Sequence, residues 1–301
     1  MVRPVIAVVG ATATGKSRLA LGLAAALGDA EIVNADAMQL YRGMDIGTAK
    51  VPPTERRGVP HHQLDVLDPS EDASVAAYQR HARRDIAGIV AAGRWVIVVG
   101  GSGLYVRAVL DELRFPGTDA VVRAHLEERA RREGSPVLHA ELAAKDPVAA
   151  AVIDARNVRR VVRALEVIEL TGAPFSATLP SGEYHRPTVQ VGLRLPVPEL
   201  DGRIALRSAT MITDGLVDEV VGLGPLSRTA ARATGYAQVL DHLAGSATLG
   251  ETVEAIALAT RQLARRQVKW FRRDARIHWL DAADPDAALG AALATLEPWL
   301  D

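Results

Sequence analysis

Short runs of β-branched and aliphatic residues recur along the first third of the chain, and each ends at a glycine or a polar loop. The clearest runs lie at residues 5–9, 32–33 and 95–99. Uninterrupted apolar runs of this kind are typical of strands that are buried on both faces of a sheet. Between them, residues 16–27 and 74–91 have the composition and spacing of helices. Strands that alternate with helices predict a parallel sheet with right-handed crossovers.

The pattern changes after residue 117. Residues 118–171 show helical spacing and many charges without a convincing strand. Alternating apolar residues return at 189–195, and 277–280 offers a last strand. The pattern therefore predicts an α/β core that is interrupted by a helical insertion. The predicted core spans residues 1–116 and 188–301, and the predicted insertion spans 117–187.

Composition and charge narrow the class of protein. The chain has 301 residues, of which 49% are hydrophobic and 24% are charged, as in globular proteins with a real core. It contains no cysteine, which excludes disulfides, cysteine-ligated zinc and thiol catalysis. The net charge of −1 requires any basic surface to be local. No apolar run approaches the roughly 20 residues of a membrane span. The chain also starts directly with a strand, so we expect a cytoplasmic protein without a signal peptide or a membrane partner.

A glycine-rich motif follows the first predicted strand and opens the first predicted helix. Residues 10–17, called here the phosphate loop, read GATATGKS and match G-x-x-x-x-G-K-[ST]. In such loops backbone N–H groups meet phosphate oxygens, the lysine adds positive charge, and the last hydroxyl can hold Mg²⁺. We predict that the loop binds a diphosphate or triphosphate on a P-loop NTPase-like sheet flanked by helices, with Mg²⁺ at Ser17. The predicted phosphate ligands are Gly10, Ala11, Thr12, Ala13, Thr14, Gly15, Lys16 and Ser17.

The phosphate loop alone does not define a reaction. A nucleotide hydrolase normally places a carboxylate at the end of a later strand. Here the strand at 95–99 is followed by Gly-Gly-Ser-Gly at 100–103, called here the glycine turn, which argues against a conventional ATPase or switch. Asp36 follows the second strand, and ligands of open parallel sheets bind at the carboxyl ends of strands. Asp36 is thus expected to face the phosphate loop, where it can accept a proton; a helix cap is the alternative.

Two other polar clusters carry less information. Asp45 lies in a glycine-containing segment and fits a turn carboxylate as well as a site residue. His61 and His62 precede Asp65 and Asp68, but they lack the i, i+4 spacing of zinc ligands on a helix. We expect the histidines to have a structural role.

Cations collect in two parts of the chain. Residues 261–276 contain seven of them, a single acid at Asp274, and the interleaved aromatic residues Trp270 and Phe271. Basic groups can neutralise a nucleic-acid backbone and rings can stack on bases. The alternative is a solvated helix face with both rings turned into the core. A second cluster at helical spacing favours a local polyanion-binding surface, and its members are Arg156, Arg159, Arg160 and Arg163.

Taken together, these segments resemble the tRNA dimethylallyltransferases, bacterial enzymes that prenylate an adenosine beside the anticodon. The resemblance covers nearly the whole chain in the order of the family. Its most specific parts are DIGTAK at 45–50 and TRQLARRQVKW at 260–270. The other matching segments are 10–17, 34–44, 61–69, 96–105, 157–172 and 211–220.

The resemblance implies transfer of a dimethylallyl group from dimethylallyl diphosphate to the N6 amine of the adenosine 3′-adjacent to the anticodon, with release of diphosphate. It implies Asp36 as the general base, Lys16 as a catalytic cation, and Ser102, where the family usually has Thr, at the mouth of the reaction channel. Arg203 and Arg207 are implied as further diphosphate ligands. The implied tRNA contacts are Asp36, Ala37, Met38, Gln39, Ser102, Arg123, Arg159, Arg160, Arg163, Arg232, Gly235, Tyr236, Arg265, Arg266, Gln267, Lys269, Trp270 and Arg272.

Three other functions stay open at this point. A prenyltransferase for free adenine nucleotides would not need the insertion or the basic stretch. A P-loop small-molecule kinase is weakened only partly by the missing strand carboxylate. A non-enzymatic RNA-binding protein could use the phosphate loop as a switch. Ala37 and Arg159 depart from the common Ser and Gln of the family, so their contacts are in question. Nothing in the pattern requires a dimer, and we expect a monomer.

Overall fold

The computed structural model describes residues 3–178 and 182–300, and within them six parallel strands form one sheet in the order β3-β2-β4-β1-β5-β6. The α/β class is therefore confirmed. The two-residue β3 was not predicted, because so short a strand carries no periodicity. The strands are β1 (Val5–Gly10), β2 (Ala30–Asn34), β3 (His61–His62), β4 (Trp95–Gly100), β5 (Thr188–Arg194) and β6 (Ile277–Asp281).

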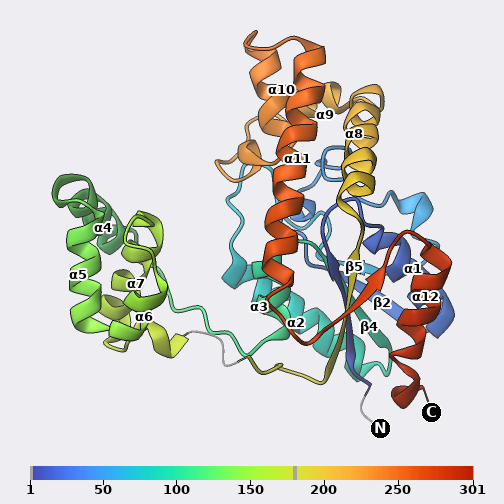
Figure 1. Ribbon diagram of the computed structural model, residues 1–301, viewed down its shortest axis with the longest axis horizontal. Helices are drawn as coiled ribbons and strands as arrows, with labels where there is room; N and C mark the ends of the chain where they lie inside the picture. Colours follow the sequence, from blue (N-terminus) through green and yellow to red (C-terminus); the bar gives the residue numbers. More distant parts are fainter. Residues whose placement is uncertain (1–2, 179–181, 301) are drawn as a thin grey trace. The chain divides into compact units, whose positions relative to one another are not determined.

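The central strand β1 has apolar neighbours on both sides. Val8 lies beside Val99 of β4 and Val191 of β5 in parallel register. Helices cover both faces of the sheet, which explains why the strands β1 and β4 are apolar throughout (Figure 1). One face packs against α1 (Lys16–Leu27) and α12 (Pro285–Ala294). The other face packs against α2 (Val75–Ala91), α3 (Gly103–Leu110) and the end of α11 (Leu249–Phe271).

A second group of helices packs beyond the sheet. Its core contains the fully buried Tyr41, Met44, Leu216 and Tyr236. The helices are α8 (Val197–Thr213), α9 (Leu216–Gly222), α10 (Tyr236–Leu243) and α11, which reaches from this group to the sheet (Figure 1). Short 3₁₀ turns connect the elements, at η1 (Met38–Leu40), η2 (Pro53–Glu55), η4 (Ala230–Arg232) and η5 (Glu297–Trp299).

Contacts divide the chain into two compact units. One comprises Met1–Leu110 with Tyr184–Asp301, and the other comprises Asp111–Glu183. The second unit overlaps the insertion predicted at 117–187, of which residues 179–181 lie outside the described residues. Its core contains Leu126, Leu138, Leu142, Val161 and Leu165. Its elements are α4 (Ala120–Glu133), α5 (Ser135–Lys145), α6 (Pro147–Val152), α7 (Val158–Thr171) and η3 (Phe175–Thr178).

A buried carboxylate ties α4 to α7 within the second unit. The Glu166 side chain is fully buried and accepts hydrogen bonds from the Asp119 N–H at 3.0 Å and from Arg123 and Arg163 at 2.9 Å. Burial acts to raise the pKa of Glu166, but the hydrogen bonds from the two arginines hold it below its ordinary value. The carboxylate is thus ionised and paired at neutral pH.

Replacing this carboxylate is expected to loosen the second unit. Glu166→Ala removes the carboxylate that Arg123, Arg163 and the Asp119 N–H share, and Arg163 keeps only its bonds to backbone carbonyls, so the local free energy of opening falls by about 1–3 kcal/mol. Hydrogen exchange of the α4 and α7 amides measures this change. Glu169→Ala is the matched control because Glu169 is exposed on the same helix. Equal exchange in both variants would contradict the expectation.

Candidate active site

The phosphate loop connects β1 to α1 through two glycines that the geometry requires. Gly10 has a φ of 142°, and a Cβ there would lie 2.7 Å from the Leu193 carbonyl oxygen. Gly15 precedes α1 with a φ of 92°. Both values lie in the left-handed region, where a side chain is strained. The loop therefore turns from strand to helix over a short distance, and the N-terminus of α1 faces its interior.

Side chains of the phosphate loop close it from within. The Ala11 carbonyl oxygen accepts the Thr14 hydroxyl at 2.8 Å and the Lys16 amine at 2.7 Å. Arg207 of α8 donates to the Thr12 hydroxyl at 2.6 Å. Arg207, a predicted diphosphate ligand far away in the sequence, thus contacts the loop that contains Lys16.

Lys16, Arg207 and Asp36 form one electrostatic group. Burial lowers the pKa of Lys16 to about 8, an effect that Asp36 opposes and Arg207 reinforces. Burial also raises the pKa of Asp36 above its ordinary value of 3.8, against the pull of the Met38 N–H and the two cations. Perturbed groups of opposite charge in one place are typical of a functional site.

Asp36 is held by its own neighbourhood. The Asn34 side chain accepts the Asp36 N–H and donates to the Asp36 carbonyl oxygen, both at 3.0 Å, and it also donates to the Gln63 carbonyl oxygen at 2.9 Å. One Asp36 carboxylate oxygen accepts the Met38 N–H at 3.0 Å. The role of Asn34 was missed in the sequence. The available signal was a polar residue directly after the apolar run at 32–33.

The glycine turn lies against the residues around Asp36. A Cβ at Gly100 would lie 2.3 Å from the Ala35 carbonyl oxygen, so only glycine permits this approach. The Ser102 hydroxyl accepts the Ala37 N–H at 3.1 Å. Ser102 and Asp36 therefore lie close together, at the start of α3 and the end of β2.

Gln267 and Tyr236 have buried side chains. Both were expected to contact tRNA, but Gln267 is 8% exposed and Tyr236 is fully buried. The Tyr236 hydroxyl donates to Glu219, and the Gln267 amide bonds to the phosphate loop and the glycine turn. Both side chains are thus buried and bonded within the fold. The basic pattern around them in the sequence carried no information on the direction in which they point.

Glu219 organises the segment that contains Asp45. Its carboxylate accepts the N–H groups of Asp45, Ile46 and Gly47 at 3.0, 2.7 and 3.3 Å. The Asp45 carboxylate itself bonds to the buried Lys50 amine at 2.6 Å. Asp45 is therefore a turn carboxylate here, which is one of its two predicted roles.

His62 helps to fix the edge of the sheet. Its Nε2 lies 2.5 Å from the Glu31 carboxylate, and Nδ1 of His61 lies 2.8 Å from the Val59 carbonyl oxygen. Both histidines belong to β3, in agreement with the structural role predicted for them. The described residues contain no cluster of three or more His, Asp or Glu that could hold a metal ion.

The Ser17 hydroxyl fits the Mg²⁺ role predicted for it. Within the described part of the chain it has no hydrogen-bond partner, and it lies in the first turn of α1. Mg²⁺ commonly binds one or two protein oxygens together with phosphate oxygens and water. A hydroxyl beside a bound diphosphate supplies such a ligand.

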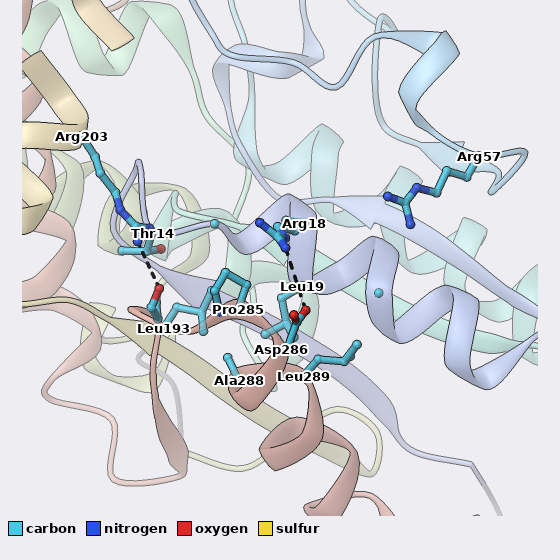
Figure 2. A pocket seen from close by; sticks show the side chains of 13 residues that line it. Thr14, Arg18, Leu19, Arg57, Leu193, Arg203, Pro285, Asp286, Ala288 and Leu289 are labelled. Carbon is cyan, nitrogen blue, oxygen red and sulfur yellow. Dashed lines mark hydrogen bonds and ion pairs between the residues drawn. The ribbon is translucent and has the colours of Figure 1, made fainter. Parts of the chain in front are cut away.

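A cavity of about 390 Å³ borders the phosphate loop at Thr14 and Gly15. Figure 2 shows Arg203 reaching toward Thr14 at one side of this cavity and Arg18 at another. Arg203 also pairs with Glu199 at 2.7 Å. The predicted diphosphate ligand Arg203 thus lies at this cavity, whereas Arg207 contacts Thr12 directly.

The predicted tRNA contacts differ in their availability. On α11 only the Phe271 ring is turned into the core, while Trp270 is 41% exposed. Arg265 pairs with Asp201 at 2.7 Å, and Arg123 and Arg163 pair with Glu166. Gly235 is buried at the start of α10. The exposed cations among the predicted contacts are Arg159, Arg160, Arg232, Arg265, Arg266, Lys269 and Arg272.

The parallel sheet and the strand–loop–helix at residues 10–17 define a P-loop NTPase-like protein. A family model described as IPP transferase matches residues 39–274. A tRNA dimethylallyltransferase of Thermobifida fusca (strain YX) is 58% identical over 290 residues, which are 94% of this chain and 91% of that protein. One from Bifidobacterium animalis subsp. lactis (strain AD011) is 54% identical over 97% of this chain and 86% of its own. The chain therefore belongs to the IPP transferase family.

Solved structures agree with this membership. A full-length tRNA isopentenylpyrophosphate transferase from Bacillus halodurans is 38% identical, with a TM-score of 0.72 and coverage of 99% of this chain and 97% of that one. A eukaryotic dimethylallyltransferase described as acting on tRNA is 26% identical, with a TM-score of 0.84 and coverage of 99% and 79%. Among the described residues, no helix combines the length and apolar character needed to cross a membrane.

The depressed pKa of Lys16 predicts that the free protein becomes more stable without this cation. The pKa of Lys16 falls from 10.5 to about 8 because burial disfavours the charged amine. Below pH 8 the amine is protonated in both the folded and the unfolded protein, so the folded state bears the full cost of the buried charge. Lys16→Met should raise the free energy of unfolding at pH 7 by about 1–2 kcal/mol. The gain should shrink between pH 8 and 10.5, where the folded amine is already neutral.

Thermal unfolding at pH 7 and pH 9.5 measures this difference. Lys269→Met serves as the control, because Lys269 is exposed on α11. A lower unfolding midpoint for Lys16→Met at pH 7 would contradict the argument.

Proposed function

We propose that the protein transfers the dimethylallyl group of dimethylallyl diphosphate to the N6 amine of the adenosine 3′-adjacent to the anticodon in tRNA, and releases diphosphate. The observation that carries the proposal is the grouping of Asp36 with Lys16 and Arg207 beside the phosphate loop. The relatives named tRNA dimethylallyltransferases support the same reaction. An acceptor-side carboxylate beside two diphosphate-binding cations suits a transfer between an amine and a diphosphate ester.

The donor half of the reaction depends on the leaving group. The exocyclic amine of adenine is a weak nucleophile, so the bond from the allylic carbon to the diphosphate oxygen is largely broken in the transition state. The diphosphate then gathers negative charge, which the loop amides, Lys16 and Arg207 stabilise. Ser17 would hold Mg²⁺, which adds positive charge beside the diphosphate oxygens when it is bound.

The acceptor half depends on Asp36. The amine loses a proton as its nitrogen bonds to the allylic carbon, and the Asp36 carboxylate accepts that proton. Because burial raises the pKa of Asp36, it is a stronger base than an exposed aspartate. Ser102 and the half-buried residues Ala37, Met38 and Gln39 lie around it and would contact the target nucleotide.

The RNA has to present an unstacked base. Enzymes that modify a base extrude it into a pocket, and the single-stranded anticodon loop lowers the cost of this step. The exposed cations of α11 would bind the RNA backbone of the anticodon loop, and Trp270 would stack on one of its bases. Arg159 and Arg160 of α7 would also bind the RNA backbone. One chain supplies the phosphate loop, the general base and the basic helix α11, which supports a monomer. We expect it to act in the cytoplasm, where tRNA is found.

Removing the base should separate catalysis from binding. Asp36→Asn keeps the shape but cannot accept the proton, so kcat should fall by about 10²–10⁴-fold, while the Kd for tRNA changes by less than about threefold. Transfer of labelled dimethylallyl groups to unmodified tRNA measures kcat. Asp214→Asn, at an exposed position, is the control. Retained turnover in Asp36→Asn would remove Asp36 from the mechanism.

The pH profile should report the same carboxylate. Asp36 must be ionised to act, so kcat/KM should decrease as pH falls through its pKa, at a value above the ordinary 3.8. Single-turnover transfer from pH 4 to 8 on wild-type protein gives the profile. A kcat/KM that stays constant down to pH 4 would show that another group controls the reaction.

A further inference from the structure

Gln267 is a buried polar residue on the basic helix α11. Its Oε1 accepts the Thr12 N–H of the phosphate loop at 2.8 Å, and its Nε2 donates to the Gly101 carbonyl oxygen of the glycine turn at 3.0 Å. The side chain is 8% exposed. Both ends of one amide are thus satisfied by two different loops, which lie 255 and 166 positions away in the chain.

The two loops serve different reactants in the proposed function. The phosphate loop holds the diphosphate of the donor, and the glycine turn carries Ser102, whose hydroxyl accepts the Ala37 N–H beside Asp36. β1 and β4 are neighbours in the sheet, but both loops leave it before they reach the site. Gln267 bridges them beyond the last paired residues, Val9 and Gly100.

The glycine turn lies directly against Gln267 and Trp270 of α11. A Cβ at Gly101 would lie 2.5 Å from the Gln267 Nε2, and a Cβ at Gly103 would lie 2.3 Å from the Trp270 ring. The absence of side chains in the glycine turn therefore lets α11 approach closely. The Gln267 amide can therefore set the distance between the phosphate loop and the glycine turn, because neither loop can shift without losing a buried hydrogen bond.

We propose that Gln267 is a positioning residue that fixes the spacing between the donor diphosphate and the acceptor amine. This inference rests on the proposed function. This role requires a side chain of the length of glutamine that ends in one hydrogen-bond acceptor and one donor. A methionine matches the length of glutamine but provides neither group, and an ionised glutamate accepts from Thr12 but opposes the Gly101 carbonyl oxygen. Misplacing the reactants by about 1 Å can cost about 10²-fold in rate.

The test compares Gln267→Met and Gln267→Glu with the wild type in prenyl transfer to tRNA. We expect kcat to fall by about 10²-fold in both variants, with the KM of each substrate changed by less than about threefold. Gln262→Met and Gln262→Glu are the controls, because Gln262 is exposed on the same helix. Thermal unfolding of each variant is measured in parallel, and a loss of kcat in a variant that unfolds with a wild-type midpoint supports positioning.

A pH series distinguishes positioning from a packing defect. The carboxyl introduced by Gln267→Glu can donate to the Gly101 carbonyl oxygen again once it is protonated, so the kcat of this variant relative to wild type should rise as pH falls from 8 to 5. The same ratio for Gln267→Met should stay flat. A kcat within about twofold of wild type in both variants, or a loss confined to KM, would overturn the inference. Absence of transfer by the wild type would instead overturn the proposed function, and this inference with it.

Discussion

The adjacency of β2, β4 and β1 is the constraint on which the rest of the structure depends. Because neighbouring parallel strands end at the same edge, three loops that are distant in sequence meet there. Asp36 comes from the first, Ser102 from the second and Lys16 from the third. The helices of both faces serve this arrangement by burying the apolar side chains of these strands. The chemistry is therefore placed by main-chain pairing, and side chains refine it.

The same edge carries a cost for the free protein. Lys16 and Arg207 both have lowered pKa values because burial disfavours their charged forms, and burial raises the pKa of Asp36. In the proposed function, the bound diphosphate adds to the counter-charge that Asp36 alone supplies to the two cations. The binding of a strongly anionic donor thus relieves an unfavourable arrangement, which is a common reason why functional sites reduce stability.

The parts of the fold and site that depend on local pattern could be predicted from the sequence. The strands other than β3, the phosphate loop and the place of Asp36 are examples, since apolar runs and a strand–glycine–helix motif locate them within a few residues. The places of Gln267 and Tyr236 could not be predicted, because each depends on a partner from a remote part of the fold. Gln267 lies among exposed cations, and nothing in the sequence distinguishes its orientation from theirs. Its partners lie 166 and 255 positions away. The role of Glu219 was missed for the same reason: it bonds to residues 172–174 positions earlier.

Glu219 shows that the chain uses one backbone device twice. Three successive N–H groups at Asp45–Gly47 converge on a carboxylate, much as the amides of a phosphate loop converge on an anion. In one case the anion belongs to the protein and stays in place for the life of the fold. In the other, under the proposed function, it arrives with the substrate and leaves as product. A concave turn of amides is thus a permanent joint when its counter-ion is covalently attached, and an exchangeable site when its counter-ion is free.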